Sequence, residues 1–325
     1  MSSSIRLPLI DMSGVREGDQ ASIRRAADAI RTACCDTGFF YIINHGVPQP
    51  VIDRAMSAAA EFFAYPTEVK RQAAVNKRHR GWHALGGATM YEASKPDHKE
   101  FFSIGLELAE EDPSVLAGEA LRGPNQWPAF MPSLREVLAE YYQEIGKAGA
   151  DLLRVVAVGL GIDEHFFIDK YTKPLQRTQM VYYPPQPAQA DADQFGVAPH
   201  TDYGCITLLY QDNSGGLQVR ELGSNSWIDA TPIPGSLVVN VGDLLARWSN
   251  NRFRSTLHRV INRSGHERYS IATFYDPTYG ALVDPCELGI DSALSLYPPV
   301  AAGDYILKRT DDSMAYRKGK APGVE

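Results

Sequence analysis

Three side chains in the second half of the chain could bind a metal ion together. His200 and Asp202 are separated by one residue, and His258 follows in the apolar run 257–261. Side chains of a strand alternate between its two faces, so a strand would place His200 and Asp202 on one face. Two imidazoles and one carboxylate form a facial triad, which leaves coordination positions open and is typical of non-haem Fe(II) sites that activate O2. The sequence therefore predicts a metal site at His200, Asp202 and His258.

A basic residue and a hydroxyl residue follow the third candidate ligand. In the apolar run 268–275, alternation would place Arg268 and Ser270 on one face of a strand. A guanidinium fork and a hydroxyl can together bind a carboxylate. Phe274 falls on the same face, which makes it a candidate for contact with a substrate. We therefore expect a carboxylate-binding site close to the metal site.

Helices are expected in the first half of the chain and strands in the second. Apolar residues recur at helical spacing over 22–36, 49–65 and 133–160. Short apolar runs separated by turns predict strands at 5–10, 178–183, 205–210, 216–221, 236–241, 257–262 and 269–274. Several short strands at this spacing are typical of a sandwich or jelly roll. We predict a mainly β fold with helices, in which a jelly-roll core is wrapped by N-terminal helices.

One structural unit is expected rather than two independent domains. Within it we distinguish an N-terminal helical and β region (1–175), a core (176–280) and a C-terminal segment (281–325). The Pro-rich stretch 184–199 leads directly into His200. We interpret this stretch as a loop at the mouth of the site and not as a linker.

Composition narrows the classes of function. The 325 residues carry a formal net charge of −7, and 44% are hydrophobic and 22% charged, which is ordinary for a folded globular protein. An acidic chain without a Lys/Arg-rich run does not favour a nucleic-acid binder. We see no segment of signal-peptide or membrane-span length, and the four cysteines form no Cys-x-x-Cys motif. We expect a cytoplasmic protein that acts on a small molecule, and the sequence does not indicate an oligomeric state.

Short motifs along nearly the whole chain occur in the order found in one enzyme family. They lie at 39–47 (FFYIINHGV), 97–102 (DHKEFF), 182–185 (YYPP), 200–204 (HTDYG), 215–219 (GGLQV), 240–243 (NVGD), 258–260 (HRV) and 268–270 (RYS). With these motifs the chain resembles the isopenicillin N synthase-like branch of the Fe(II)/2-oxoglutarate-dependent dioxygenases. The resemblance implies a double-stranded β-helix core with Fe(II) at His200, Asp202 and His258. It also implies that the far carboxylate of 2-oxoglutarate is bound by Arg268, Ser270 and Tyr183.

The activity implied by the resemblance is the oxidation of a small-molecule metabolite with O2, by hydroxylation, desaturation or cyclisation. Succinate and CO2 would be released from 2-oxoglutarate. Val181 stands where plant relatives often have Asn, which bears on a co-substrate or substrate contact. Isopenicillin N synthase and aminocyclopropane-carboxylate oxidases keep an Arg-x-Ser pair but do not use 2-oxoglutarate. An oxidase of that type is therefore the alternative, and a non-catalytic metal-binding sensor is a further one.

Aromatic residues supply further candidates for substrate contact. Besides Phe274 these are Trp82, His83, Tyr91 and Phe102, although buried aromatic side chains more often fill the core. The remaining histidines outside the metal site have no partner at ligand spacing. We interpret them as structural or exposed residues: His45, His79, His98, His165 and His266.

Overall fold

Two β-sheets lie at the centre of the structure, a computed structural model that describes residues 6–89, 95–186 and 193–314. Within these ranges the larger sheet has eight strands in the order β1-β2-β10-β7-β12-β5-β4-β3. Its strands are β1 (Leu9–Asp11), β2 (Phe39–Ile43), β3 (Gly81–His83), β4 (Glu100–Gly105), β5 (Arg177–Tyr183), β7 (Ile206–Gln211), β10 (Leu237–Val241) and β12 (Arg268–Tyr275). The smaller sheet, of order β6-β11-β8-β9, contains β6 (Val197–His200), β8 (Leu217–Arg220), β9 (Trp227–Asp229) and β11 (His258–Val260). The fold is thus mainly β with helices, as expected for a jelly-roll core.

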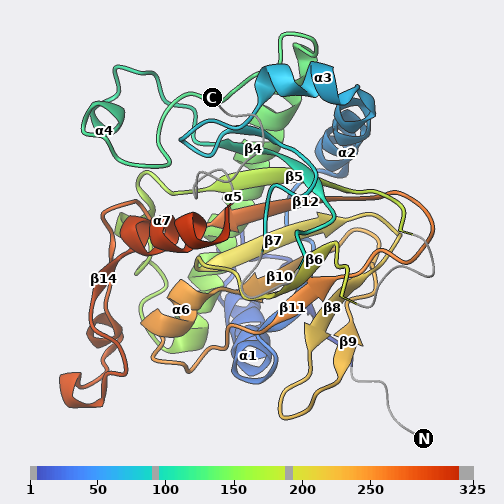
Figure 1. The fold of residues 1–325 in the computed structure, drawn as a ribbon. Coiled ribbons are helices and arrows are strands. Elements are labelled where there is room, and N and C mark those ends of the chain that lie inside the picture. The colour runs from blue at the N-terminus through green and yellow to red at the C-terminus, as the bar shows by residue number, and fades with distance from the viewer. Residues whose placement is uncertain (1–5, 90–94, 187–192, 315–325) are drawn as a thin grey trace, which may run out of the picture.

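The larger sheet combines strands from distant parts of the chain. β1 and β2 extend it at one edge, where β2 pairs antiparallel with β10, and β3 and β4 extend it at the other edge through β5. Strands from 1–175 and from 176–280 therefore share one sheet (Figure 1). The division of the chain into three regions stays a prediction.

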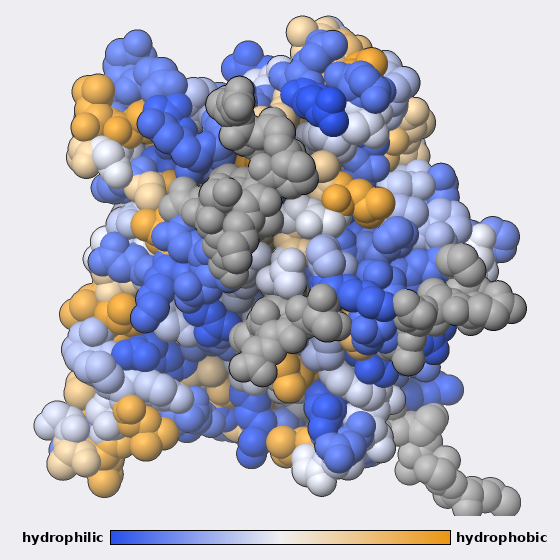
Figure 2. Space-filling model, in the orientation of Figure 1, coloured by the Kyte–Doolittle hydropathy of each residue, from blue (hydrophilic) through white to orange (hydrophobic). Residues whose placement is uncertain are grey.

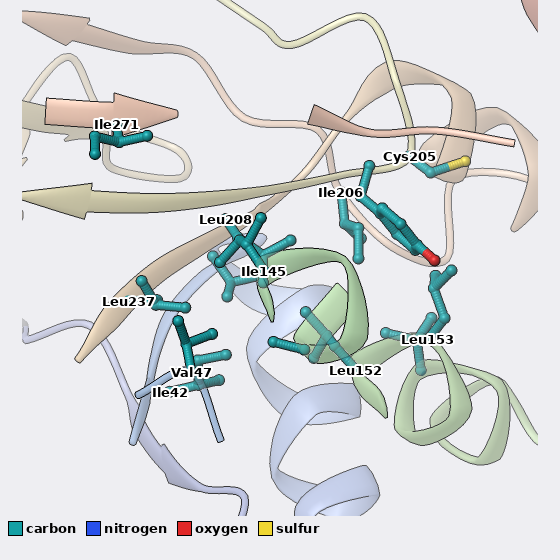
Figure 3. Packing of buried hydrophobic residues seen from close by; sticks show 14 of the residues in the cluster. Ile42, Val47, Ile145, Leu152, Leu153, Cys205, Ile206, Leu208, Leu237 and Ile271 are labelled. Carbon is teal, nitrogen blue, oxygen red and sulfur yellow. The ribbon is translucent and has the colours of Figure 1, made fainter. Parts of the chain in front are cut away.

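Helices cover one face of the larger sheet. The longest described helix, α5 (Ser133–Leu160), packs against α1 (Gln20–Asp36) and α2 (Gln49–Ala64) and against strands β7 and β12. Figure 3 shows Ile145 and Leu152 of α5 next to Leu208 of β7, all of them buried. The predicted helices at 22–36, 49–65 and 133–160 are confirmed, and each buries its apolar residues.

The shorter elements lie around this core. They are α3 (Thr67–Lys70), α4 (Pro113–Leu116), α6 (Asp243–Trp248), α7 (Ala302–Ser313), and the pair β13 (Leu282–Val283) and β14 (Val300–Ala301). Of these, α6 and α7 matter for the site, because both lie beside the loop that follows β6. Figure 2 shows a face covered mostly by hydrophilic side chains, with hydrophobic ones in small separate groups.

None of the helices in the described ranges is both long and apolar enough to cross a membrane.

Candidate active site

Three side chains that could bind one metal ion meet at the end of the smaller sheet. His200 ends β6 and lies opposite His258, the first residue of the antiparallel strand β11. The Nε2 atoms of His200 and His258 lie 3.6 and 3.7 Å from Asp202 Oδ1. One ligand atom from each residue lies within 4.8 Å of the others, as a metal site requires. We call His200, Asp202 and His258 the metal triad.

Asp202 reaches this space in a different way from the one expected. β6 ends at His200, so strand alternation does not place the Asp202 side chain. The loop is instead held by the start of α6, where the Asp243 N–H donates to the Asp202 carbonyl at 2.8 Å. The Thr201 hydroxyl donates to the Asp243 carboxylate at 3.1 Å. The prediction of a shared strand face is wrong for this pair, although its two side chains do come together.

Hydrogen bonds orient both imidazoles of the metal triad. Nδ1 of His200 lies 2.8 Å from the Ala198 carbonyl, and Nδ1 of His258 lies 3.2 Å from the Thr256 carbonyl. A carbonyl can only accept, so each Nδ1 donates a proton, and each Nε2 faces the space that it shares with Asp202 Oδ1. Burial, reinforced by the neighbouring His258, lowers the pKa of His200 to about 3. The ring is therefore neutral at physiological pH, as a metal ligand must be.

The Asp202 carboxylate is fixed through one of its two oxygens. Oδ2 accepts hydrogen bonds from the Thr207 hydroxyl at 2.6 Å and from the Asn240 amide at 2.8 Å. Burial raises the pKa of Asp202, but the two imidazoles and these hydrogen bonds outweigh it, and the pKa lies below its ordinary value. Oδ1 remains directed at the imidazoles. The donor set, two imidazole nitrogens and one carboxylate oxygen, fits Fe(II).

A cavity of about 70 Å³ extends from the metal triad between the two sheets. We call it the intersheet cavity. Strands β5, β7, β10 and β12 of the larger sheet contribute its lining, together with β6, β8 and β11 of the smaller one. Arg268, Ser270 and Phe274 all line it, as their alternation along one strand predicted. Tyr183 lines it as well, opposite Arg268 in the β5–β12 pairing.

Arg268 is a buried cation whose described partners are all neutral. It is 1% exposed, and its guanidinium donates to the Gly215 carbonyl at 2.7 Å, to Gln211 Oε1 at 3.1 Å and to Ser270 Oγ at 3.3 Å. The guanidinium lies 4.6 Å from the centre of the Tyr183 ring. Among the residues that the structure describes, no carboxylate forms an ion pair with it. Because an unpaired buried charge is costly, this end of the cavity is suited to an anion.

A second cavity of about 70 Å³ adjoins the metal triad at His200 and Asp202. We call it the α7 cavity, because Thr310 of α7 and the following Met314 close part of it. Phe274 borders both cavities. The other lining side chains outside the triad and its loop are mostly polar or aromatic: His79, Lys99, Phe101, Arg177 and Gln179.

The structure corrects the expected positions of Trp82 and Phe102. The two residues pair across β3 and β4 and face the helices, away from both cavities. The Trp82 indole donates to Glu100 Oε2 at 2.6 Å, and Phe102 packs against Phe62 with ring centres 4.9 Å apart. Both are core residues because the β3–β4 register turns them to the helical side of the sheet.

His83 points to the opposite side of the sheet from Trp82 but does not line the α7 cavity, because Phe101 lies between them. Its ring stacks on Phe101 with centres 3.9 Å apart, and Phe101 is the residue that lines the cavity. Tyr91 lies outside the described residues. Of the predicted aromatic contacts, Phe274 is thus the one whose side chain the structure places directly at the cavities.

Sequence reasoning missed three polar residues of the α7 cavity. Gln179 and Arg177 follow from the alternation along β5 that also places Tyr183, because they lie two and three steps of that pattern before it. Lys99 alternates with Phe101 in the same way. His79, which we interpreted as structural or exposed, is 1% exposed and lines the cavity from a turn with φ of 62°. No local pattern in the sequence marks that position.

Comparisons with known proteins show which protein family this chain resembles in sequence. Residues 7–130 match the model of the non-haem dioxygenase in morphine synthesis N-terminal family, and residues 174–277 match that of the 2OG-Fe(II) oxygenase superfamily. A 2-oxoglutarate-Fe(II) type oxidoreductase of Emericella nidulans, hxnY, is 37% identical over 309 residues, which cover 92% of this chain and 88% of that protein. A homoarginine-6-hydroxylase of Arabidopsis thaliana is 33% identical, and the match covers 93% of this chain and 93% of that protein.

Solved structures agree with these relatives. A full-length Neurospora crassa protein in complex with alpha-ketoglutarate and thymine superposes with a TM-score of 0.84 at 30% identity, covering 96% of this chain and 98% of that one. A 2OG-Fe(II) oxygenase family protein of Caulobacter crescentus gives a TM-score of 0.82 at 28% identity, covering 94% of this chain and 99% of that one. The chain belongs to the 2OG-Fe(II) oxygenase superfamily. It is a 2-oxoglutarate-dependent oxygenase that uses Fe(II) and O2, and the comparisons favour this activity over that of an oxidase without 2-oxoglutarate.

Proposed function

We propose that the metal triad binds Fe(II) and that 2-oxoglutarate binds in the intersheet cavity with its far carboxylate against Arg268 and Ser270. The observation that carries the proposal is the buried Arg268 guanidinium, which has only neutral partners among the described residues and shares a cavity with the triad. Fe(II) bound at the triad would supply the activation of O2 that is coupled to oxidation of 2-oxoglutarate to succinate and CO2.

The surrounding side chains would hold these groups and keep water out. The Arg268 guanidinium stands over the Tyr183 ring, which would help to hold it in place. Phe39 packs edge-on against His258 with ring centres 5.1 Å apart. Apolar side chains, Val197 and Val260 among them, line the intersheet cavity between its two charged ends. A charge held in such a buried cavity interacts more strongly than it would in bulk water.

The α7 cavity is our proposed binding site for the substrate to be oxidised. It reaches the metal triad at His200 and Asp202 but does not include Arg268, and Phe274 would contact both the substrate and the co-substrate. A small-molecule substrate is supported by the similar Neurospora crassa protein, which was solved with thymine and with 5-formyluracil. The expectations that the chain is cytoplasmic and binds neither nucleic acid nor membranes stay predictions.

The Arg268→Lys variant tests the co-substrate site. Lysine keeps the charge but loses the planar fork, so the dissociation constant of 2-oxoglutarate should rise about tenfold or more while Fe(II) binding persists. Arg259→Lys is the matched control, because Arg259 is a neighbour of His258 in β11 but stacks on Trp227 at 4.0 Å and lines neither cavity. The readout is the metal-to-ligand charge-transfer band in an anaerobic titration of the Fe(II) protein.

Equal affinities in the Arg268→Lys variant and the wild type would contradict the assignment of the carboxylate site. Absence of the band in the wild type would favour the alternative oxidase, which does not use 2-oxoglutarate.

A further inference from the structure

We infer that the α7 cavity selects a neutral substrate, a flat ring that carries C=O and N–H groups, and disfavours a carboxylate. The inference rests on the proposed function, in which this cavity takes the substrate to be oxidised. It concerns the charge and the hydrogen-bonding groups of that substrate. Four features of the cavity support it.

The first feature is the ion pair of Arg177. Its guanidinium donates to Asp276 Oδ2 at 3.1 Å, and the two side chains are 6% and 0% exposed. The other Asp276 oxygen accepts a hydrogen bond from the Cys205 N–H at 2.8 Å. Gly204 makes room for this carboxylate, because a Cβ atom there would lie 1.6 Å from Asp276 Oδ1. Arg177 therefore has a buried carboxylate partner of its own.

The second feature repeats this arrangement at Lys99. Its ammonium lies 3.2 Å from Asp97 Oδ2, and the two side chains are 10% and 1% exposed. The other Asp97 oxygen accepts a hydrogen bond from the Ala198 N–H at 3.0 Å. Both described cations that line the α7 cavity are thus neutralised by buried carboxylates. A substrate carboxylate would therefore find no unpaired cation among the described side chains that line this cavity, and burying its charge there would be costly.

The third feature is the contrast with Arg268 on the same pair of strands. In the β5–β12 ladder Arg268 lies opposite Tyr183, and Arg177 lies opposite Phe274. Each guanidinium stands over the aromatic ring of its cross-strand partner, at 4.6 Å from Tyr183 and 5.0 Å from Phe274. The two ends of the paired strands β5 and β12 differ, because Arg177 has a carboxylate partner and Arg268 has only neutral partners among the described residues. One end is therefore suited to an anion and the other to a neutral hydrogen-bond acceptor.

The fourth feature is the hydrogen-bonding capacity left in the cavity. The Arg177 Nε atom is buried without an acceptor. The amide of Gln179 also lines the cavity. An amide side chain offers one acceptor and two donors, which complements a C=O next to an N–H on a ligand. Phe101, Phe274 and Met314 provide apolar walls suited to a ring. A cyclic or ring-bound amide meets all of these conditions.

Benzamide and benzoate test the charge preference, because they have nearly the same shape and differ in charge. Each is titrated by calorimetry, without O2, into protein loaded with Fe(II) and 2-oxoglutarate. We expect the dissociation constant of benzamide to be lower than that of benzoate by about tenfold or more. Benzoate binding as tightly as benzamide, or no binding of either probe at millimolar concentration, would overturn the inference.

Two substitutions assign the preference to the residues that should cause it. Asp276→Asn removes the charge that neutralises Arg177, so the benzamide-to-benzoate affinity ratio should shift toward benzoate by about tenfold. Asp229→Asn is its control, since Asp229 is an exposed residue of β9 that lines neither cavity.

Gln179→Met should weaken benzamide binding about fivefold, because it removes the amide that would bind the amide of the probe. Gln218→Met removes an amide outside the cavities and should leave benzamide binding unchanged.

If Asp276→Asn does not fold, Asp97→Asn makes the same change at Lys99. An unchanged affinity ratio in a folded, iron-loaded variant would overturn the inference. The 2-oxoglutarate charge-transfer band, recorded in the same samples, separates the two levels of the proposal. Absence of the band in the wild type means that the proposed co-substrate site fails. Presence of the band together with a preference for benzoate means that only the inference about the substrate fails.

Discussion

At the scale of single residues, each member of the metal triad is oriented by a hydrogen bond to a residue outside the triad. Backbone carbonyls fix the tautomers of His200 and His258, and two side chains hold Asp202 through one oxygen. Such partners set the direction in which a ligand atom points, and losing one typically weakens metal binding by about ten- to a hundredfold.

Thr207→Val should therefore weaken Fe(II) binding about tenfold, because the Asp202 carboxylate loses its shortest hydrogen bond, 2.6 Å from the Thr207 hydroxyl. Thr273→Val is the control, because it removes a buried hydroxyl from the same sheet. That hydroxyl is hydrogen-bonded to Thr178, and neither residue lines the intersheet cavity or the α7 cavity. The measurement is the dissociation constant of Fe(II) by anaerobic equilibrium dialysis. Equal constants for both variants and the wild type would show that Thr207 does not orient the ligand.

The residues that sequence patterns predicted best are those whose positions depend on local geometry. Alternation along one strand was enough to group Arg268, Ser270 and Phe274 on one face. Trp82 and Phe102 were misplaced because the side of the sheet that they face depends on the β3–β4 register and on where the helices pack. Both are long-range properties that no short window of sequence contains.

At the scale of elements, α5 shows how far an apolar pattern determines structure. The pattern predicted 133–160, and the helix spans Ser133–Leu160 before Gly161 ends it with φ of 78°. The strand at His200 shows the limit of such patterns. β6 ends at His200, and the first residue of α6 then donates a hydrogen bond from its N–H to the Asp202 carbonyl. This contact joins residues that lie far apart in the sequence.

Leu152→Ala tests the contribution of α5 to stability. Leu152 is fully buried against the larger sheet (Figure 3), so truncation removes apolar contacts and leaves a cavity. The free energy of unfolding in urea should fall by about 3 kcal/mol. Leu116→Ala, in the short helix α4, should change it little, because Leu116 is 73% exposed. A similar small change in both variants would contradict the central role of α5.

The turn after β2 should make stability depend on pH. Burial lowers the pKa of His45 from 6.5 to about 4, and its neutral Nδ1 accepts a hydrogen bond from the Val47 N–H at 3.2 Å. The unfolded chain takes up this proton between pH 6.5 and 4 while the folded chain does not, so stability falls as the pH drops through that window. By pH 5 the loss should be about 2 kcal/mol relative to neutral pH.

His45→Asn keeps an acceptor for the Val47 N–H but does not titrate in this range. Its free energy of unfolding should fall less than that of the wild type between pH 7 and pH 5. The comparison uses urea denaturation at matched ionic strength. Parallel pH profiles for the two proteins would show that His45 does not contribute.

At the scale of the whole molecule, the site depends on two sheets brought face to face. The smaller sheet supplies the two imidazoles, the larger sheet supplies Arg268 and the residues that hold Asp202, and α7 closes the second cavity from near the end of the chain. Motif order along the sequence was enough to predict the family, its cofactors and the type of fold. The α7 cavity was not predicted, because its lining comes from segments as far apart as His79 and Met314.

The most direct test of the metal triad is the amount of Fe(II) bound by the His258→Ala variant. His258 is one of three protein ligands in the proposal, so iron stoichiometry and succinate formation should both collapse, while the circular dichroism spectrum stays that of a folded protein. His165→Ala removes an exposed imidazole of the same kind and should bind iron as the wild type does. A His258→Ala protein that still binds one equivalent of iron and forms succinate at the wild-type rate would contradict the proposed metal centre.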